Sequence, residues 1–140
     1  MIKAVFFDLD GILVDAVQWH FQALNTALEE ISNTCIESHE VEHFNGLPTL
    51  RKLEMLQTQG RVLADDIPLI WHRKQNLTKE TIAQNGQIMP EKVALHQALA
   101  DLSISRACVT NSIYDTAALM LQVTGQMDYM QLLITNDAIK

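Results

Sequence analysis

Apolar residues fill the start of the chain almost without a break. Residues 2–7 are apolar, β-branched or aromatic apart from Lys3. A short run of this kind predicts a strand, and its lack of alternation predicts burial on both faces, as in a parallel sheet covered by helices. The strand is expected to end at Asp8, because acidic residues and a glycine follow at once.

The pattern then becomes helical and later alternates. Apolar residues recur at spacings of three and four. Up to about residue 86 no strand-like run separates these segments, and from residue 87 they alternate with short β-branched runs. The spacing predicts helices over residues 17–31, 38–44, 48–58, 65–84, 91–102 and 113–123, and further strands over 105–110 and 132–135. Helix–strand alternation is typical of a Rossmann-like α/β fold with a parallel sheet. We expect a discontinuous α/β core (1–14 and 87–140) interrupted by a four-helix domain (15–86).

Two carboxylates come directly after the first predicted strand. Asp8 and Asp10 stand at its carboxyl end, where open α/β sheets bind ligands, and Gly11 permits a tight turn there. Such a pair can hold one hard cation and keep one carboxylate free to react. Acidic residues also commonly end strands and begin turns, so a purely structural role is the alternative.

A second polar junction follows the predicted strand 105–110. The hydroxyl of Thr110 and the backbone N–H of Asn111 stand where a strand meets a helix, which is a suitable cradle for a phosphate. The alternative is that either residue only caps the following helix.

These segments together resemble the haloacid dehalogenase-like (HAD) hydrolases. Residues 7–15 (FDLDGILVD) resemble the first motif of that family. Residues 19–24 and 44–48 are similar to the cap helix and cap loop of its β-phosphoglucomutase-like branch. Residues 109–112 (VTNS) resemble the second motif, and residues 135–140 (TNDAIK) resemble the segment just before the third. The matches follow the family's order over the whole chain.

The resemblance implies a phosphoryl-transfer site. Asp8 would be the nucleophile that forms an aspartyl-phosphate, and Asp10 the general acid and then the base. Both would bind Mg²⁺, which needs few protein ligands because it keeps several waters. Thr110 and Asn111 would hold the phosphate. The helical domain would be a cap, closing about hinges near residues 13–15 and 86–89.

Two cap residues are candidates for substrate binding. Residues 71–75 resemble a cap helix with a substrate-facing lysine, which would be Lys74, and His20 matches a cap histidine. The alternatives are a solvated helix face for Lys74 and a packed helix residue for His20. Thr49 stands where sugar phosphomutases of the family carry an arginine, and Arg51 lies two positions on. A phosphatase acting on a small phosphorylated metabolite is therefore favoured over a mutase.

The family's third and fourth motifs are not found. One is a lysine before a proline, and Lys140 lacks that proline; the other is an acidic pair on a fourth strand. Without that strand the first strand would form an open apolar edge, which favours self-association. We therefore expect the chain to be the N-terminal part of a longer enzyme. A catalytically inactive binding module is the alternative.

The composition of the chain argues against several other classes of function. The net charge of −7 argues against nonspecific nucleic-acid binding, and no apolar run approaches the roughly 20 residues of a membrane span. Cys35 and Cys108 form no metal or redox motif, so a cytoplasmic protein is expected. Residues 39–43 (HEVEH) match a zinc-protease pattern, but Gly46 and Pro48 cut that helix short, so zinc catalysis is not expected.

Overall fold

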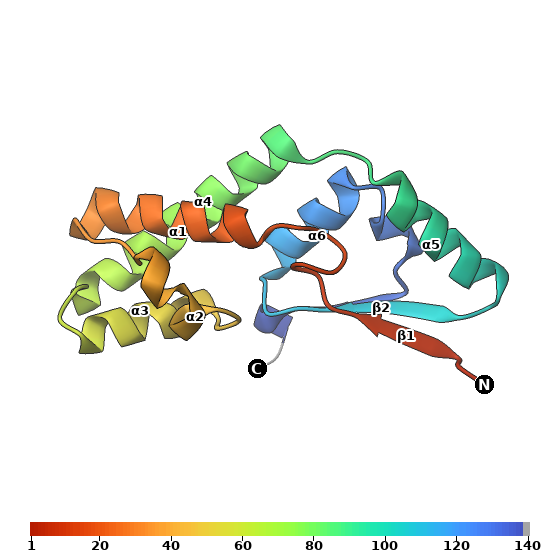
Figure 1. Cartoon of the computed structure of the whole chain (residues 1–140), viewed down its shortest axis with the longest axis horizontal. Helices are drawn as coiled ribbons and strands as arrows, with labels where there is room; N and C mark the ends of the chain where they lie inside the picture. The colour runs from red at the N-terminus through yellow and green to blue at the C-terminus, as the bar shows by residue number, and fades with distance from the viewer. Residues whose placement is uncertain (139–140) are drawn as a thin grey trace. The chain divides into compact units, whose positions relative to one another are not determined.

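The computed structural model describes residues 1–138, and the chain folds as two compact units. The first unit comprises Met1–Val17 and the chain from Lys79 onward, and the second comprises Gln18–Thr78. Figure 1 shows the strands in the first unit and a set of helices in the second. The division falls inside one long helix, whereas the sequence pattern places it after residue 86.

The first unit is an α/β layer. Its strands are β1 (Ala4–Phe7), β2 (Ser105–Val109) and β3 (Leu132–Ile134), and its helices are α5 (Pro90–Asp101) and α6 (Tyr114–Val123). The strands are all parallel and lie in the order β1-β2-β3. This confirms the predicted Rossmann-like α/β class. Short 3₁₀ turns over Met127–Tyr129 and Asn136–Ala138 flank β3 and were not predicted.

The helices of this unit cover one face of the sheet. Each crossover moves one strand further in the same direction, so right-handed connections place α5 and α6 on the same side (Figure 1). His96 of α5 meets the ring of Phe7 edge-on at a centroid distance of 5.5 Å, which identifies the covered face. Phe7 pairs with Cys108, and Cys108 pairs with Leu133, so these three share that face.

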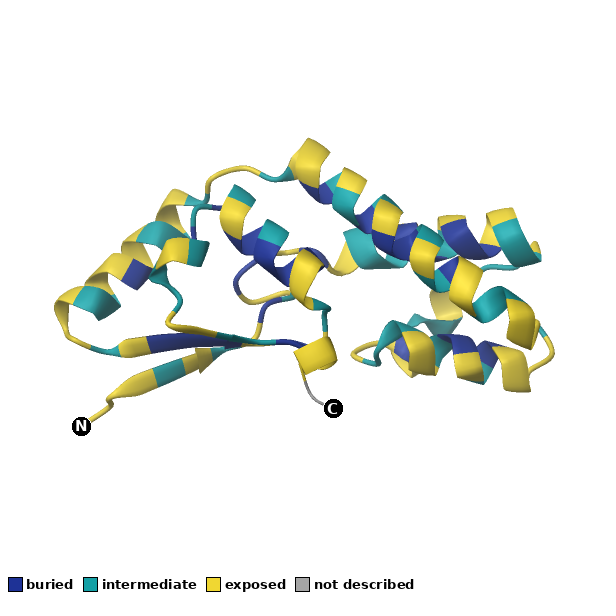
Figure 2. Ribbon diagram, turned by 180° about the vertical axis from the view of Figure 1, so that it is seen from behind, coloured by how far each residue is buried: buried dark blue, intermediate teal, exposed yellow. Residues whose placement is uncertain are grey.

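The opposite face of the sheet carries exposed apolar side chains. Phe6, Ala107 and Leu132 align across the strands, and Val109 lies on the same face two positions beyond Ala107. Phe6 is 67% exposed, Leu132 50% and Val109 40%. Figure 2 colours much of β1 as exposed. The prediction that the first strand is buried on both faces is therefore wrong. Within residues 1–138, β1 pairs with a single strand, and His96 of α5 packs on its other face.

The second unit is a small helical bundle. It contains α1 (Val17–Ser32), α2 (Val41–Phe44), α3 (Thr49–Thr58) and the first part of α4 (Ile67–Asn85), with 3₁₀ turns over Ser38–Glu40 and Ala64–Asp66. The four predicted helices are present, each within about two residues of its expected bounds except that the second is divided into a 3₁₀ turn and α2. Over residues 1–138, no helix has the length and apolar character needed to cross a bilayer.

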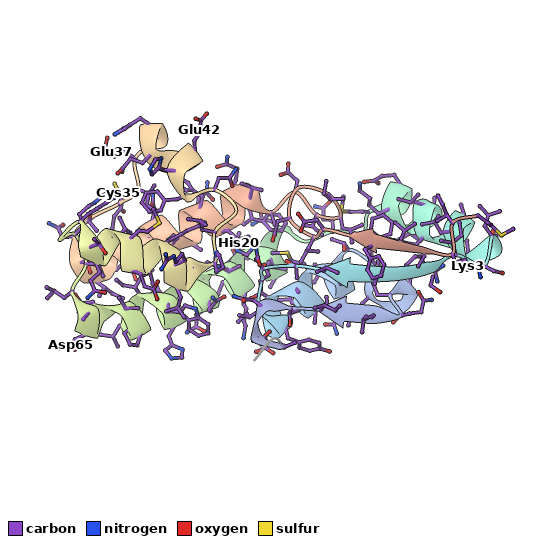
Figure 3. The ribbon with its side chains drawn as sticks, turned by 90° about the horizontal axis from the view of Figure 1, so that it is seen from below. Lys3, His20, Cys35, Glu37, Glu42 and Asp65 are labelled. Atoms are coloured by element: carbon purple, nitrogen blue, oxygen red, sulfur yellow. The ribbon has the colours of Figure 1, made fainter. Side chains whose placement is uncertain are left out.

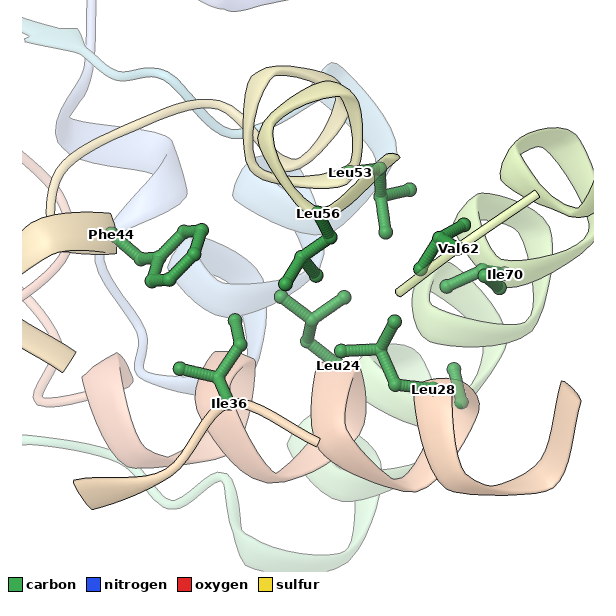
Figure 4. Close-up of a cluster of buried hydrophobic side chains, with 9 residues drawn as sticks. Leu24, Leu28, Ile36, Phe44, Leu53, Leu56, Val62 and Ile70 are labelled. Atoms are coloured by element: carbon green, nitrogen blue, oxygen red, sulfur yellow. The ribbon is translucent and has the colours of Figure 1, made fainter. Parts of the chain in front are cut away.

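Aliphatic side chains from α1, α3 and α4 form the core of this bundle. Leu24 and Leu28 project from α1, Leu53 and Leu56 from α3, and Ile70 from α4 (Figure 4). The positions are three or four residues apart within each helix, so each helix presents one apolar stripe. The same spacing in the sequence predicted these helices.

Candidate active site

The loop after β1 is fixed by its own backbone. The carbonyl of Leu9 accepts hydrogen bonds from the N–H groups of Ile12, Leu13 and Val14, at 3.3, 3.0 and 3.1 Å. Gly11 has a φ of +81°, a left-handed conformation that favours glycine, and its N–H donates to the carbonyl of Val14 at 2.7 Å. The loop therefore has one defined conformation that carries both predicted acids.

Asp8 and Asp10 lie in different surroundings within this loop. Asp8 is exposed at the end of β1, and its Oδ1 accepts a hydrogen bond from the N–H of Leu9 at 2.8 Å. Asp10 is half-buried, and its Oδ2 accepts a hydrogen bond from the hydroxyl of Ser112 at 3.2 Å. The exposed acid is accessible to an incoming group, and the half-buried one is held by a neighbouring loop.

Both acids influence the buried thiol at the end of β2. Burial, followed by the negative charges of Asp8 and Asp10, raises the pKa of Cys108 to about 12. The buried thiol therefore stays protonated at neutral pH. Because Cys108 lies two residues before Thr110, this electrostatic effect indicates that the two acids lie near the end of β2.

Thr110 and Ser112 form the second part of the site. The hydroxyl of Thr110, which is buried, accepts a hydrogen bond from the N–H of Ser112 at 3.1 Å and keeps its own hydrogen for donation. Asn111 between them is exposed. The structure thus brings Asp10 together with the loop of Thr110 and Asn111 through Ser112. Sequence reasoning included Ser112 in the motif but assigned it no role.

The segment after β3 fixes the same loop from the other side. The N–H of Thr110 donates to the carbonyl of Ile134 at 2.9 Å, and the N–H of Asn136 donates to the carbonyl of Ser112 at 3.1 Å. Asp137 Oδ1 accepts from the Thr135 hydroxyl at 2.7 Å and from the N–H of Tyr114 at 2.9 Å. These hydrogen bonds, that of Thr135 above all, lower the pKa of Asp137.

Asp137 therefore holds the start of α6 and was missed as a site-supporting residue. The signal for it was its place after a predicted strand, at the same sheet edge as Asp8 and Thr110. Ile139 and Lys140, which end the resemblance to the segment before the third motif, lie outside the described residues.

His20 and Lys74 meet within the helical unit. The Nζ of Lys74 on α4 lies 3.1 Å from the Nδ1 of His20 on α1; Figure 3 labels His20. Lys74 is only 5% exposed, so the alternative of a solvated helix face is wrong. A buried ammonium group needs hydrogen-bond acceptors, and the imidazole supplies one. Whether the pair binds substrate stays a prediction.

The acids suit a hard cation only with help from other ligands. Among residues 1–138, no three His, Cys, Asp or Glu side chains gather as a metal site. Asp8 offers a carboxylate oxygen and Asp10 a backbone carbonyl oxygen, the kinds of donor that Mg²⁺ takes, and Mg²⁺ commonly keeps water and substrate phosphate as its other ligands. The donor chemistry therefore fits Mg²⁺. His39 and His43 of the zinc-like pattern lie in separate short elements, the 3₁₀ turn and α2.

Known proteins share this sequence and this fold. The sequence matches the haloacid dehalogenase-like hydrolase family over residues 5–140. The plasmid phosphoglycolate phosphatase of Cupriavidus necator is 33% identical, and the match covers 97% of this chain and 59% of the relative. Phosphoglycolate phosphatase of Thiobacillus denitrificans is 25% identical, with 99% and 62% covered. This chain thus spans about three fifths of the curated relatives that it matches.

Solved structures agree in fold. CbbY from Rhodobacter sphaeroides, in complex with phosphate, superposes with a TM-score of 0.86 at 16% identity, over 99% of this chain and 65% of that one. β-Phosphoglucomutase from Clostridium difficile superposes with a TM-score of 0.82 at 19% identity, over 100% and 64%. The α/β core with its helical insertion is thus the fold of these proteins. The match over residues 5–140 establishes that the chain belongs to the haloacid dehalogenase-like hydrolase family.

Proposed function

We propose that this chain supplies the nucleophile and the phosphate cradle of a Mg²⁺-dependent phosphomonoester hydrolase. The observation that carries the proposal is the arrangement of Asp8 and Asp10 on a fixed loop, with Asp10 bound to Ser112 beside Thr110. Membership of the hydrolase family supports it. The curated relatives are phosphoglycolate phosphatases, so a small phosphorylated metabolite is the proposed substrate class.

In the proposed reaction a carboxylate oxygen of Asp8 attacks phosphorus. The phosphorus–oxygen bond to the leaving alcohol breaks as Asp10 gives that oxygen a proton, and the phosphoryl group is left on Asp8. Asp10 then takes a proton from water, whose oxygen attacks phosphorus; the phosphorus–oxygen bond to Asp8 breaks, which frees phosphate and restores the Asp8 carboxylate. Mg²⁺ held by Asp8 and Asp10 would neutralise phosphate charge. Thr110 and the N–H of Asn111 would bind the phosphate oxygens that do not react.

The helical unit would select the substrate. The buried Lys74 contacts the half-buried His20, and a lysine that already contacts an imidazole is held in place for a carboxylate or a phosphate. Arg51, near the position where mutases carry an arginine, forms an ion pair with Glu54 at 2.9 Å on α3. Thr49 at the matched position is not basic, which supports a phosphatase over a sugar phosphomutase. A cytoplasmic location is proposed with it, on the two free cysteines.

The decisive experiment is Asp8→Asn. Hydrolysis of p-nitrophenyl phosphate is measured with and without EDTA, for this chain and for the intact protein isolated from cells. We expect Mg²⁺-dependent turnover of the intact protein to disappear in Asp8→Asn, because an amide does not attack phosphorus. Asp15→Asn removes a nearby exposed carboxylate and serves as the matched control. Survival of turnover in Asp8→Asn would refute the mechanism.

A second function, as a binding module, is favoured by the exposed sheet face. Phe6, Val109 and Leu132 offer an apolar surface at an open edge, through which this chain would associate with itself. Under this proposal the chain binds phosphate without turning it over. Hydrolysis by this chain at rates well above buffer would exclude it, and phosphate binding without hydrolysis would support it.

A further inference from the structure

A buried amide and a buried imidazole lie directly behind the loop of the two acids. His96 projects from α5, and Gln126 follows α6; both side chains are 0% exposed. His96 Nε2 lies 2.9 Å from Gln126 Oε1. Gln126 Nε2 lies 3.0 Å from the carbonyl of Leu13, which belongs to the acid-bearing loop. The four atoms form one chain of contacts from α5 to that loop.

The donor and the acceptor of each hydrogen bond in this series of contacts can be assigned from the groups at its ends. The Leu13 carbonyl only accepts, and the Thr124 hydroxyl donates to the carbonyl of Met120 at 2.7 Å. Both therefore accept from Gln126 Nε2, which lies 2.9 Å from Thr124 Oγ1. The amide oxygen must then face His96, whose Nε2 carries the hydrogen. The amide has one allowed orientation.

The imidazole is itself locked in place. Its ring meets Phe7 edge-on and stacks on Tyr129 at a centroid distance of 5.7 Å and an interplanar angle of 22°. Its Nδ1 is buried with no hydrogen-bond partner among the described residues. Burial lowers the pKa of His96, which keeps the ring neutral and leaves Nδ1 as the unprotonated nitrogen. An unpaired buried nitrogen costs free energy of folding. That cost is consistent with a His96–Gln126 pair retained because it positions the loop.

We propose that Gln126, oriented by His96, is a positioning residue that holds the Asp8–Val14 loop by its Leu13 carbonyl and so sets the place of Asp10. Asp10 forms a β-bridge with Val14, the residue next to Leu13, so displacement of Leu13 reaches Asp10 through one peptide unit. The catalytic part of this inference rests on the proposed function. Gln126 Nε2 also lies 3.9 Å from Met89 Sδ, so the amide touches both segments predicted as hinges.

The test compares Gln126→Met with Leu121→Ala. Gln126→Met keeps the length of the side chain but removes both donors and the acceptor. Leu121, fully buried in the same unit, tests for general loss of packing. Amide hydrogen exchange is measured for Gly11, Leu13 and Val14, whose N–H groups bond within the loop, and for Thr110, whose N–H bonds across the sheet.

We expect Gln126→Met to speed exchange in the loop about fivefold relative to Thr110, because the Leu13 carbonyl loses its hydrogen bond to the amide. Leu121→Ala is expected to change both sets of amides in parallel. In the intact protein, Gln126→Met is expected to lower kcat about tenfold or more with a smaller change in KM, because Asp10 acts in the transition state.

A second pair of variants keeps the test decisive if Gln126→Met fails to fold. His96→Gln can still donate a hydrogen bond to the Gln126 oxygen, whereas His96→Leu cannot. Retained loop protection in the first and loss in the second would support the inference. Unchanged loop exchange relative to Thr110 in the variants that fold would overturn it. If Asp8→Asn kept its activity, the proposed function would fail, and the exchange result would still decide the role of Gln126 in the loop.

Discussion

At the scale of single residues, the site depends on side chains that hold others in place. Ser112 donates to Asp10, and Asp137 accepts from the N–H of Tyr114 at the start of α6. Neither residue carries chemistry of its own in the proposed reaction. Each instead restricts a loop that presents a reacting or binding group, which lowers the entropy lost on reaching a productive geometry.

Ser112→Ala tests this at the acid itself. Loss of the hydroxyl removes a hydrogen bond to a half-buried carboxylate, which is worth about 1.5–3 kcal/mol when the partner is charged. We expect kcat for aryl phosphate hydrolysis by the intact protein to fall at least about tenfold. Ser105→Ala, an exposed change at the other end of β2, is the control. Equal rates in the two variants would contradict a role for Ser112.

Glu40 gives a prediction about pH. The side chain binds Arg61, with Oε1 2.6 Å from Nη1, and also accepts from the N–H of Glu37. These hydrogen bonds, the one from Arg61 first, lower the pKa of Glu40 from 4.5 to about 2. A lowered pKa means that the stabilisation is fully present above about pH 4.5 and is lost as the pH falls through about 2.

Glu40→Gln should therefore reduce the free energy of unfolding at pH 7 and have progressively less effect as the pH falls from 4.5 to about 2. Urea unfolding, followed by helical circular dichroism at several pH values, measures the difference. Glu42→Gln makes the same change of charge on α2, away from Arg61. A difference between wild type and Glu40→Gln that does not shrink in acid would contradict the assignment.

Some of these residues were predictable and others were not. Asp8, Asp10, Thr110 and Asn111 stand next to predicted strand ends, where chemistry is expected. His96 and Gln126 lie 30 residues apart in the sequence and carry no local signal, because a helical apolar pattern tolerates one buried histidine as readily as an exposed one. Buried polar pairs of this kind depend on tertiary contacts.

At the scale of elements, helix α4 shows what the periodic pattern does not contain. Its extent was predicted to within about two residues, because caps and apolar spacing are local. The apolar spacing does not show which of the two units each turn of α4 packs in. Ile70 packs in the core of the helical unit, whereas Gly86, directly after the helix, faces Val123 of α6. The cap assignment over 15–86 accordingly stays a prediction.

Gly86→Ala tests the close approach after α4. An added Cβ would lie 2.4 Å from Val123 Cγ2 and 2.6 Å from the Ile82 carbonyl oxygen, so the backbone or Val123 must move. We expect a loss of about 1–3 kcal/mol of unfolding free energy, as for other overpacked sites. Adding Val123→Ala should recover part of that loss in a double-mutant cycle. A Gly86→Ala variant as stable as the wild type would show that the contact is looser.

At the scale of the whole molecule, the helices of the α/β unit, as described over residues 1–138, cover one face of the sheet. The family's strand and helix order predicted an open edge at β1, and the structure has β1 paired with β2 alone among residues 1–138. The apolar composition of β1 suggested burial on both faces instead. An apolar composition permits a strand to be buried on both faces. The number of neighbouring strands and helices determines how much of its surface is in fact buried.

Phe6→Lys tests whether this face drives self-association. A charged residue at the open edge of the exposed face should raise the monomer fraction at every concentration, because burying an unpaired charge is costly. Sedimentation velocity across a concentration series measures it. Leu69→Lys replaces an equally prominent apolar residue, 58% exposed on α4, and should have little effect. Identical behaviour of both variants and the wild type would contradict association through the sheet.

The parallel pairing of β1 with β2 also affects the order in which parts of the chain fold. Ala4 pairs with Ser105, so about 100 residues must be made before the first strand finds its partner, and closing so long a loop is entropically slow. The core of the helical unit, from Leu24 to Ile70, lies entirely between these strands in the sequence and can assemble during that delay. Asp8, the proposed nucleophile, is thus among the first residues to be synthesised, but its place beside Thr110 can form only after β2 has been made.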